Sequence, residues 1–156
     1  MFLPAVPVAK LLEGVHNSEY VLPAIQREFI WNTGQICNLF DSLMRGYPIG
    51  SFLFWKVDQT EAGNYTFYDF ITDYHEKNSP YAHTKQIPHG QGATAILDGQ
   101  QRLTALNIGL YGSLSERLPR MHSSNPAAYP KKRLYLNLLG QPSRDDALYN
   151  LSLIHI

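Results

Sequence analysis

The chain has 156 residues, enough for one domain with its own hydrophobic core and too few for two. Its composition, 44% hydrophobic and 17% charged, is that of an ordinary globular protein. Thirteen basic and thirteen acidic residues cancel, so the charge balance gives no support to DNA binding through phosphate contacts by this segment alone.

No apolar run approaches the length of a membrane span, and the first residues lack the basic-then-apolar plan of a signal peptide. Cys37 is the single cysteine, which excludes an internal disulfide and a cysteine-based zinc cluster. A reducing, cytoplasmic compartment fits this cysteine usage, and no membrane partner is expected.

The N-terminal part predicts a helix and a strand. Pro7 precedes Val8, Leu11, Leu12 and Val15, whose spacing is that of a short amphipathic helix. Residues 20–22 then predict a strand that Pro23 ends.

Residues 26–31 form an unusual connector, because large aromatic side chains follow a Gln-Arg pair. One interpretation is an anchoring loop whose Phe29 and Trp31 fill the edge of the core. The functional alternative places Gln26 and Arg27 in a cleft on that rigid base. Taken alone, the segment favours the anchoring loop.

The next helix is the most secure one in the sequence. Asn32 and Gln35 form a capping pair before an apolar stripe at residues 36, 39, 40 and 43, and Gly46 closes the helix. Residues 51–57 are nearly continuously apolar and aromatic, which predicts a buried strand. Residues 65–67 predict a return strand.

The following region predicts less regular structure. Tyr68, Ile71 and Tyr74 suggest a short helix, and residues 75–92 read as a long loop. The loop holds His75, His83 and His89, whose spacing matches no zinc template, so solvated histidines are expected.

Two further features lie near the C-terminal end. The basic run at residues 131–133 favours a solvated strand edge over a nucleic-acid patch, and Leu134–Leu139 predicts a strand. Asp145 and Asp146 could begin another helix.

The rest of the chain is organised around residues 95–106, Ala-Ile-Leu-Asp-Gly-Gln-Gln-Arg-Leu-Thr-Ala-Leu. A short apolar run passes through Asp98-Gly99 into a helical pattern with Leu103, Leu106, Leu110 and Leu114 on one stripe. This layout predicts a strand, a tight turn and a helix, and such a turn collects backbone N–H groups and the positive helix end at one point. Arg102 adds a planar set of donors suited to phosphate or carboxylate.

A purely structural interpretation of these residues is equally open. Asp98 is a good N-cap, and Gln101 three residues later completes a capping-box pattern. Gln100 and Arg102 are left over by that interpretation, because a cap needs neither side chain. The residues alone do not decide between a cap and an anion site.

Several stretches together resemble a known family. Residues 20–23 with Gln26, Arg27 and Trp31, then residues 46–51 (Gly-Tyr-Pro-Ile-Gly-Ser), then Asp-Gly-Gln-Gln-Arg at 98–102 occur in the family's order and rough spacing. The sequence resembles, from about residue 11 to 139, the N-terminal DGQQR domain of GmrSD-type, modification-dependent (type IV) restriction endonucleases. The resemblance implies an α+β fold of the ParB and sulfiredoxin group, a small mixed sheet with packed helices.

The resemblance also implies an activity. It implies binding and hydrolysis of a nucleoside triphosphate with a divalent cation such as Mg²⁺, in a regulatory domain for phage defence. The partners implied are modified DNA, reached through the full-length protein, and a nuclease domain or subunit, usually of the HNH type. No nuclease motif occurs in this sequence, so DNA cleavage is not expected of this segment.

The implied site consists of the motif and the Gln-Arg pair. Gly99, Gln100 and Arg102 are expected to bind nucleotide, and Gln26 and Arg27 to lie at the same cleft. Asp98 either holds the cation or positions the attacking water, and Gln100 or Gln101 orients the water or the base. A nucleotide- or modified-DNA-binding module without turnover is the alternative, and a structural domain with a well-capped helix is a third.

The C-terminal boundary is a further expectation. Residues 1–150 are assigned to the domain, which is expected to be truncated at its C-terminal end. Residues 151–156 are expected to be a non-native tail, because the sequence ends abruptly after a new element starts at about Asp145.

Overall fold

The computed structural model describes residues 4–24, 28–88, 90–140 and 147–155. It is an α+β fold with three α-helices and two small sheets. The helices are α1 (Val8–His16), α2 (Thr33–Met44) and α3 (Gln100–Tyr111). Two short 3₁₀ turns occur at Ala62–Asn64 and Pro126–Ala128. The strands are β1 (Tyr20–Pro23), β2 (Leu53–Val57), β3 (Phe67–Tyr68), β4 (Asp73–His75), β5 (Thr84–Lys85), β6 (Ala93–Asp98), β7 (Ser113–Ser115), β8 (Lys132–Leu136) and β9 (Leu151–His155).

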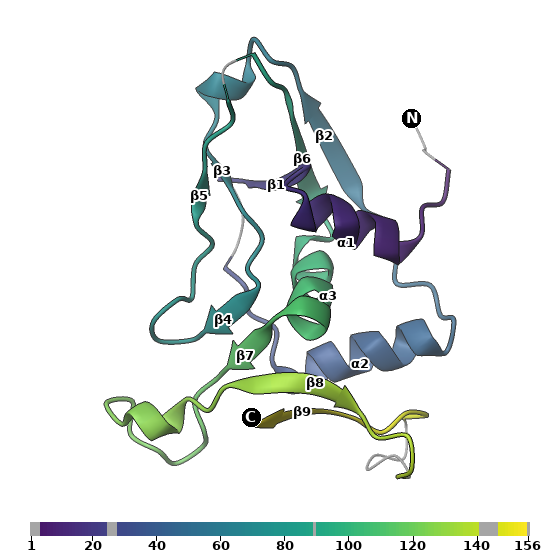
Figure 1. The fold of residues 1–156 in the computed structure, drawn as a ribbon, viewed down its shortest axis with the longest axis vertical. Coiled ribbons are helices and arrows are strands. Elements are labelled where there is room, and N and C mark those ends of the chain that lie inside the picture. The colour runs from purple at the N-terminus through teal and green to yellow at the C-terminus, as the bar shows by residue number, and fades with distance from the viewer. Residues whose placement is uncertain (1–3, 25–27, 89, 141–146, 156) are drawn as a thin grey trace.

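The two sheets lie at opposite ends of α3, as Figure 1 shows. The first has the order β2-β6-β1-β3-β5 and the second the order β4-β7-β8-β9. In the first sheet, β1 runs parallel to β6, whereas β2 is antiparallel to it. Strand β6 leads into α3 and α3 leads into β7, so one continuous stretch of chain joins the two sheets.

Helix α3 is the centre of the core. Leu103, Ala105, Leu106 and Ile108 are all fully buried. Burial on adjacent positions means that no single apolar stripe exists, because helices and strands surround α3 instead of covering one face. The predicted stripe is therefore wrong at its C-terminal end: Leu110 is 55% exposed, and Leu114 belongs to β7.

The first two helices follow the sequence pattern closely. Helix α2 begins with the expected capping box, in which the Asn32 side chain accepts from the Gln35 amide and the Gln35 side chain accepts from the Asn32 amide. The predicted helix at α1 and the predicted strand at β1 are also confirmed. Phe29 is buried, with its ring centroid 5.3 Å from that of Tyr74, which confirms the anchoring role of this connector.

Three further sequence predictions differ from the fold. Tyr68 and Tyr74 lie in β3 and β4 rather than on a helix. Strand β2 is an edge strand with Leu53 55% exposed, so it is not a buried one. Strand β8 lies between β7 and β9, which means that the basic run does not occupy a sheet edge. Its Lys131 and Lys132 pair with Asp73 and Glu116 at N–O distances of 3.5 and 3.1 Å.

Glu116 joins α2 to the second sheet. Its carboxylate accepts from the Thr33 hydroxyl and pairs with Lys132. Burial alone would raise the pKa of Glu116, but the Thr33 hydroxyl and Lys132 outweigh burial and hold that pKa below its usual value of 4.5. The ionised carboxylate is therefore part of the folded structure.

Asp41, a buried carboxylate on α2, holds the segment before β9. One oxygen accepts from the amides of Leu148 and Tyr149, both at 2.9 Å, and the other pairs with Arg45 at 3.1 Å. Strand β9 then pairs with β8 over five residues. The assignment of residues 151–156 to a non-native tail stays a prediction. The possible helix at Asp145 and Asp146 lies outside the described residues.

Candidate functional site

The turn between β6 and α3 has the geometry that the sequence predicts. Strand β6 ends at Asp98, Gly99 adopts a φ of +88°, and α3 begins at Gln100. A Cβ atom at Gly99 would overlap the Phe52 ring, so the left-handed backbone and the close approach both require glycine. Residue 99 is the N-cap of α3, and no side chain caps this end of the helix. The interpretation of Asp98 as an N-cap is therefore wrong, because its backbone is still part of the strand.

An uncapped helix end has consequences for ligands. The first-turn N–H groups of an α-helix have no partner inside the helix, and the helix dipole adds partial positive charge there. In the part of the chain that the structure describes, no side chain accepts from these groups at α3. Asp98 directly precedes this turn, and its side chain is 70% exposed, with one oxygen 3.7 Å from the Arg102 guanidinium. This end of α3 can meet an anion together with a cation held by Asp98.

Arg102 forms hydrogen bonds with the loop that contains the Tyr-Pro-Ile-Gly block at residues 47–50. Its guanidinium donates to the backbone oxygen of Ile49 and, at 2.8 Å, to that of Ser51. The guanidinium carbon also lies 4.9 Å from the centre of the Phe52 ring. Only 20% of the side chain is exposed. These two hydrogen bonds use two of the five N–H donors of the guanidinium, so the main role of Arg102 is structural. Its other N–H groups can still donate to a ligand.

Gln101 and Gln100 also bind backbone. The Gln101 amide donates to the Glu28 oxygen at 2.7 Å and accepts from the Ile30 amide at 3.1 Å. Gln100 donates to the Ile96 oxygen of β6. The three long side chains of the motif thus hold three different segments of the chain against the start of α3. Sequence reasoning missed the contacts of Gln101 and Arg102, because the motif carries no local sign of which distant backbone groups it binds.

The Gln-Arg pair cannot be placed in this site, since Gln26 and Arg27 lie outside the described residues. Their neighbour Glu28 is held by Gln101, as described above. Among the described residues, no group of three or more His, Cys, Asp or Glu side chains could hold a metal ion. A solvated histidine was expected at position 75, but His75 is half-buried, stacks on Tyr129 and accepts from the Lys77 amide. A lone carboxylate such as Asp98 still fits Mg²⁺ bound with phosphates, which usually takes one or two protein carboxylates.

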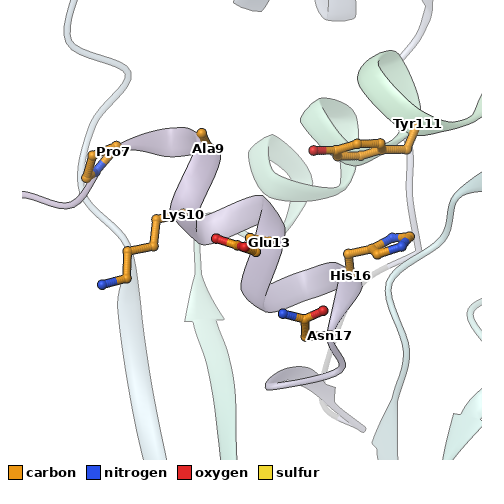
Figure 2. Close-up of a pocket in the computed structure, with 7 residues that line it drawn as sticks. All are labelled: Pro7, Ala9, Lys10, Glu13, His16, Asn17 and Tyr111. Atoms are coloured by element: carbon orange, nitrogen blue, oxygen red, sulfur yellow. The ribbon is translucent and has the colours of Figure 1, made fainter.

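Two of the hollows on the described surface bear on the predicted site. The larger, about 570 Å³, lies along α1 and the end of α3, and none of the predicted site residues lines it. Figure 2 shows Lys10 pointing away from His16 and Tyr111, so these side chains do not converge on one point. The smaller, about 310 Å³, is lined by Glu28 and Phe29 next to the Gln101 contact and by Thr104 of α3. The smaller hollow is therefore the one adjacent to the motif.

The fold and the turn define a small α+β domain whose DGQQR motif both starts the central helix and holds the loops around it. The chain belongs to the family of the GmrSD restriction endonuclease N-terminal domain, whose model matches residues 8–152. It is also similar to the uncharacterized protein MJ0686 of Methanocaldococcus jannaschii, with 30% identity over 142 residues. That match covers 91% of this chain and 22% of the relative, so the chain spans about a fifth of that protein's length. No helix among the described residues is long and apolar enough to cross a membrane.

Proposed function

We propose that this domain binds and hydrolyses a nucleoside triphosphate with Mg²⁺ at the N-terminal end of α3. The observation that carries the proposal is the turn at Gly99, which leaves the helix end uncapped beside the exposed carboxylate of Asp98. Uncapped helix ends of this kind are ready-made phosphate sites. Membership of the GmrSD family supports a role on DNA for the larger protein.

Each motif residue has a role in this proposal. The first-turn amides after Gly99 bind phosphate oxygens, and the remaining donors of Arg102 add positive charge. Asp98 would hold the cation, which when bound would neutralise phosphate charge. Gln100 and Gln101 act mainly by position, since their amides already bind backbone. We include Gln26 and Arg27 in the site on the family resemblance alone.

The wider assignment follows from the family. We propose that the fold is of the ParB and sulfiredoxin group. We further propose that nucleotide turnover regulates a nuclease domain or subunit of the HNH type, which lies outside this chain and cuts modified DNA. The domain is then the regulatory part of an anti-phage restriction protein.

A binding module without turnover is the second candidate. It is favoured by one specific observation: Gln100, Gln101 and Arg102 are all engaged with backbone, which leaves Asp98 as the only ionisable side chain of the motif that is mostly exposed. In that case nucleotide, or modified DNA, would stabilise one conformation of the domain without being changed.

Thermal unfolding with nucleotide tests binding, and phosphate release tests turnover. With Mg²⁺ and each of ATP, GTP, CTP and UTP at a hundredfold excess over its dissociation constant, a bound nucleotide stabilises the domain by about 2.7 kcal/mol. An unchanged melting temperature with all four at millimolar concentration would contradict the proposal. Stabilisation without phosphate release would favour the binding module.

Asp98→Asn separates the two candidates further. Asparagine cannot hold the cation as well, so phosphate release should fall sharply while nucleotide affinity changes less. The fold should be unaffected, because the Asp98 side chain is mostly exposed and its ion pair is long. Equal turnover by parent and variant would remove Asp98 from the mechanism.

A further inference from the structure

The cleft of about 310 Å³ beside the motif is lined by residues from several elements. Its walls come from the ends of β1 and β3, the connector before α2, the segments on either side of β4, and α3. The lining residues are Leu22, Ala24, Glu28, Phe29, Tyr68, Ile71, Pro80, Tyr81, Ala82 and Thr104. The volume is at the lower end of the range for small-molecule sites, which suits a ligand of one or two rings.

The lining favours a flat, uncharged ligand. Three aromatic side chains, Phe29, Tyr68 and Tyr81, line the cleft, and Tyr81 is 61% exposed, so its ring is available for stacking. Glu28 is the only charged residue in the lining, and no lysine or arginine of the described chain contributes to it. A phosphate group would be repelled by a carboxylate without a balancing cation, whereas an aromatic ring with N–H donors would be attracted.

Thr104 supplies a polar group inside this apolar lining. It is only 2% exposed and lies in the wall of the cleft. A hydroxyl in the wall of a cleft can donate one hydrogen bond to a ligand and accept others from it. Together with the Glu28 carboxylate, it gives one donor and several acceptors for the edge of a heterocyclic ring.

The cleft also lies at the right place relative to the proposed phosphate site. Thr104 follows Gln101 by three residues, so both side chains lie on one face of α3. Gln101 binds Glu28, which lines the cleft. Gln100 and Thr104 are about 6 Å apart along the helix axis, which is roughly one turn. A ligand with a ring in the cleft can therefore extend its other end toward the start of α3.

We infer that this cleft binds the nucleobase of the nucleotide whose phosphates lie at the N-terminal end of α3. The inference rests on the proposed function and adds the ring-binding part of the same site. Tyr81 stacks on the base, and Thr104 and Glu28 bind its edge. These residues determine which nucleobase binds, whereas the motif binds the phosphates, which all nucleoside triphosphates have in common.

The experiment compares two probes on the same variants, ATP, GTP, CTP and UTP on one side and inorganic triphosphate on the other, each with Mg²⁺. Tyr81→Ala should weaken nucleotide binding roughly tenfold, the size of one lost stacking contact, and leave triphosphate binding unchanged. Thr104→Val should weaken it roughly fivefold, and Thr104→Ser, which keeps the hydroxyl, should not. Tyr135→Ala is the matched control, because Tyr135 is 47% exposed on β8 in the other sheet.

The outcomes separate this inference from the proposed function. If triphosphate and nucleotides bind and the Tyr81 and Thr104 variants match the parent for every nucleotide, the cleft is not the base site. If neither probe binds, the proposed function itself has failed. A single-stranded oligonucleotide is the third probe: variants that lose its binding but keep full nucleotide affinity would overturn the inference, because the ring would then come from DNA.

Discussion

The contact between Arg102 and the loop at residues 49–51 can be tested through Gly50. Gly50 has a φ of +88°, and a Cβ atom there would lie 2.5 Å from the guanidinium Nη1 of Arg102. Gly46 also has a positive φ, +74°, but its Cβ would meet nothing within 4 Å. Alanine at Gly46 therefore measures the backbone cost alone, and alanine at Gly50 measures the same cost plus the displaced guanidinium.

The magnitudes follow from these contacts. A non-glycine residue in the left-handed region costs about 1–2 kcal/mol, which is the expected loss for Gly46→Ala. Hydrogen bonds from a charged donor contribute about 1.5–3 kcal/mol each, so Arg102→Ala should cost about 3 kcal/mol once partial access of water to the two carbonyls is allowed for. Gly50→Ala should cost about 3 kcal/mol, because it adds the backbone strain to the loss of one of these bonds.

The double variant gives the decisive result. With Arg102 already removed, Gly50→Ala should cost only the backbone term of about 1–2 kcal/mol, so the two changes together should destabilise by about 1–2 kcal/mol less than their sum. Urea unfolding of the four proteins, with Gly46→Ala alongside, measures this coupling. Additivity within about 0.5 kcal/mol would refute the reasoning, since independent sites add to within that range.

Three other predictions follow from the site and the core. Gly99→Ala should lower the melting temperature more than Gly46→Ala, because its Cβ overlaps an aromatic ring as well as straining the backbone; equal shifts would contradict this. Gln101→Leu should speed hydrogen exchange at the Ile30 amide, whereas Gln101→Glu, which keeps an acceptor oxygen, should not, as NMR would show. Because the pKa of Glu116 is lowered on folding, its contribution to the free energy of unfolding is present above pH 4.5 and lost as the pH falls through the lower folded value. Glu116→Gln should flatten this acid dependence in urea titrations below pH 4.5, and an unchanged slope would show that other carboxylates carry it.

The sequence predicts those parts of the fold that depend on neighbouring residues. The capping box at Asn32 and Gln35 is a local hydrogen-bond pattern, and the glycine turn before α3 follows from the Asp-Gly pair between a strand and a helix. The family resemblance, carried by the order of three blocks, is confirmed. These features need no knowledge of what packs against them.

Features that depend on distant residues were not predictable. Tyr68 and Tyr74 have helical spacing, yet pairing with distant strands places them in β3 and β4. Asp98 has the chemistry of an N-cap, but the pairing of β6 with β2 keeps it in the strand. The hydrogen-bond partners of Gln101 and Arg102 are backbone groups of distant residues, which no residue type identifies. The cleft at Thr104 was not predicted for the same reason, because the residues that line it come from six separate stretches of sequence.

The hydrogen bonds between the motif and distant loops determine the order in which these parts of the chain can fold during synthesis. The Gln101–Ile30 and Arg102–Ile49 hydrogen bonds span 71 and 53 residues. At about 5–20 residues per second, a ribosome takes roughly 3–10 seconds to make the shorter of these spans. Both loops therefore leave the ribosome well before the side chains that hold them, and their final conformations must wait for α3. A nascent chain arrested before Gln100 should expose these loops to protease, and one extended well past Tyr111 should protect them.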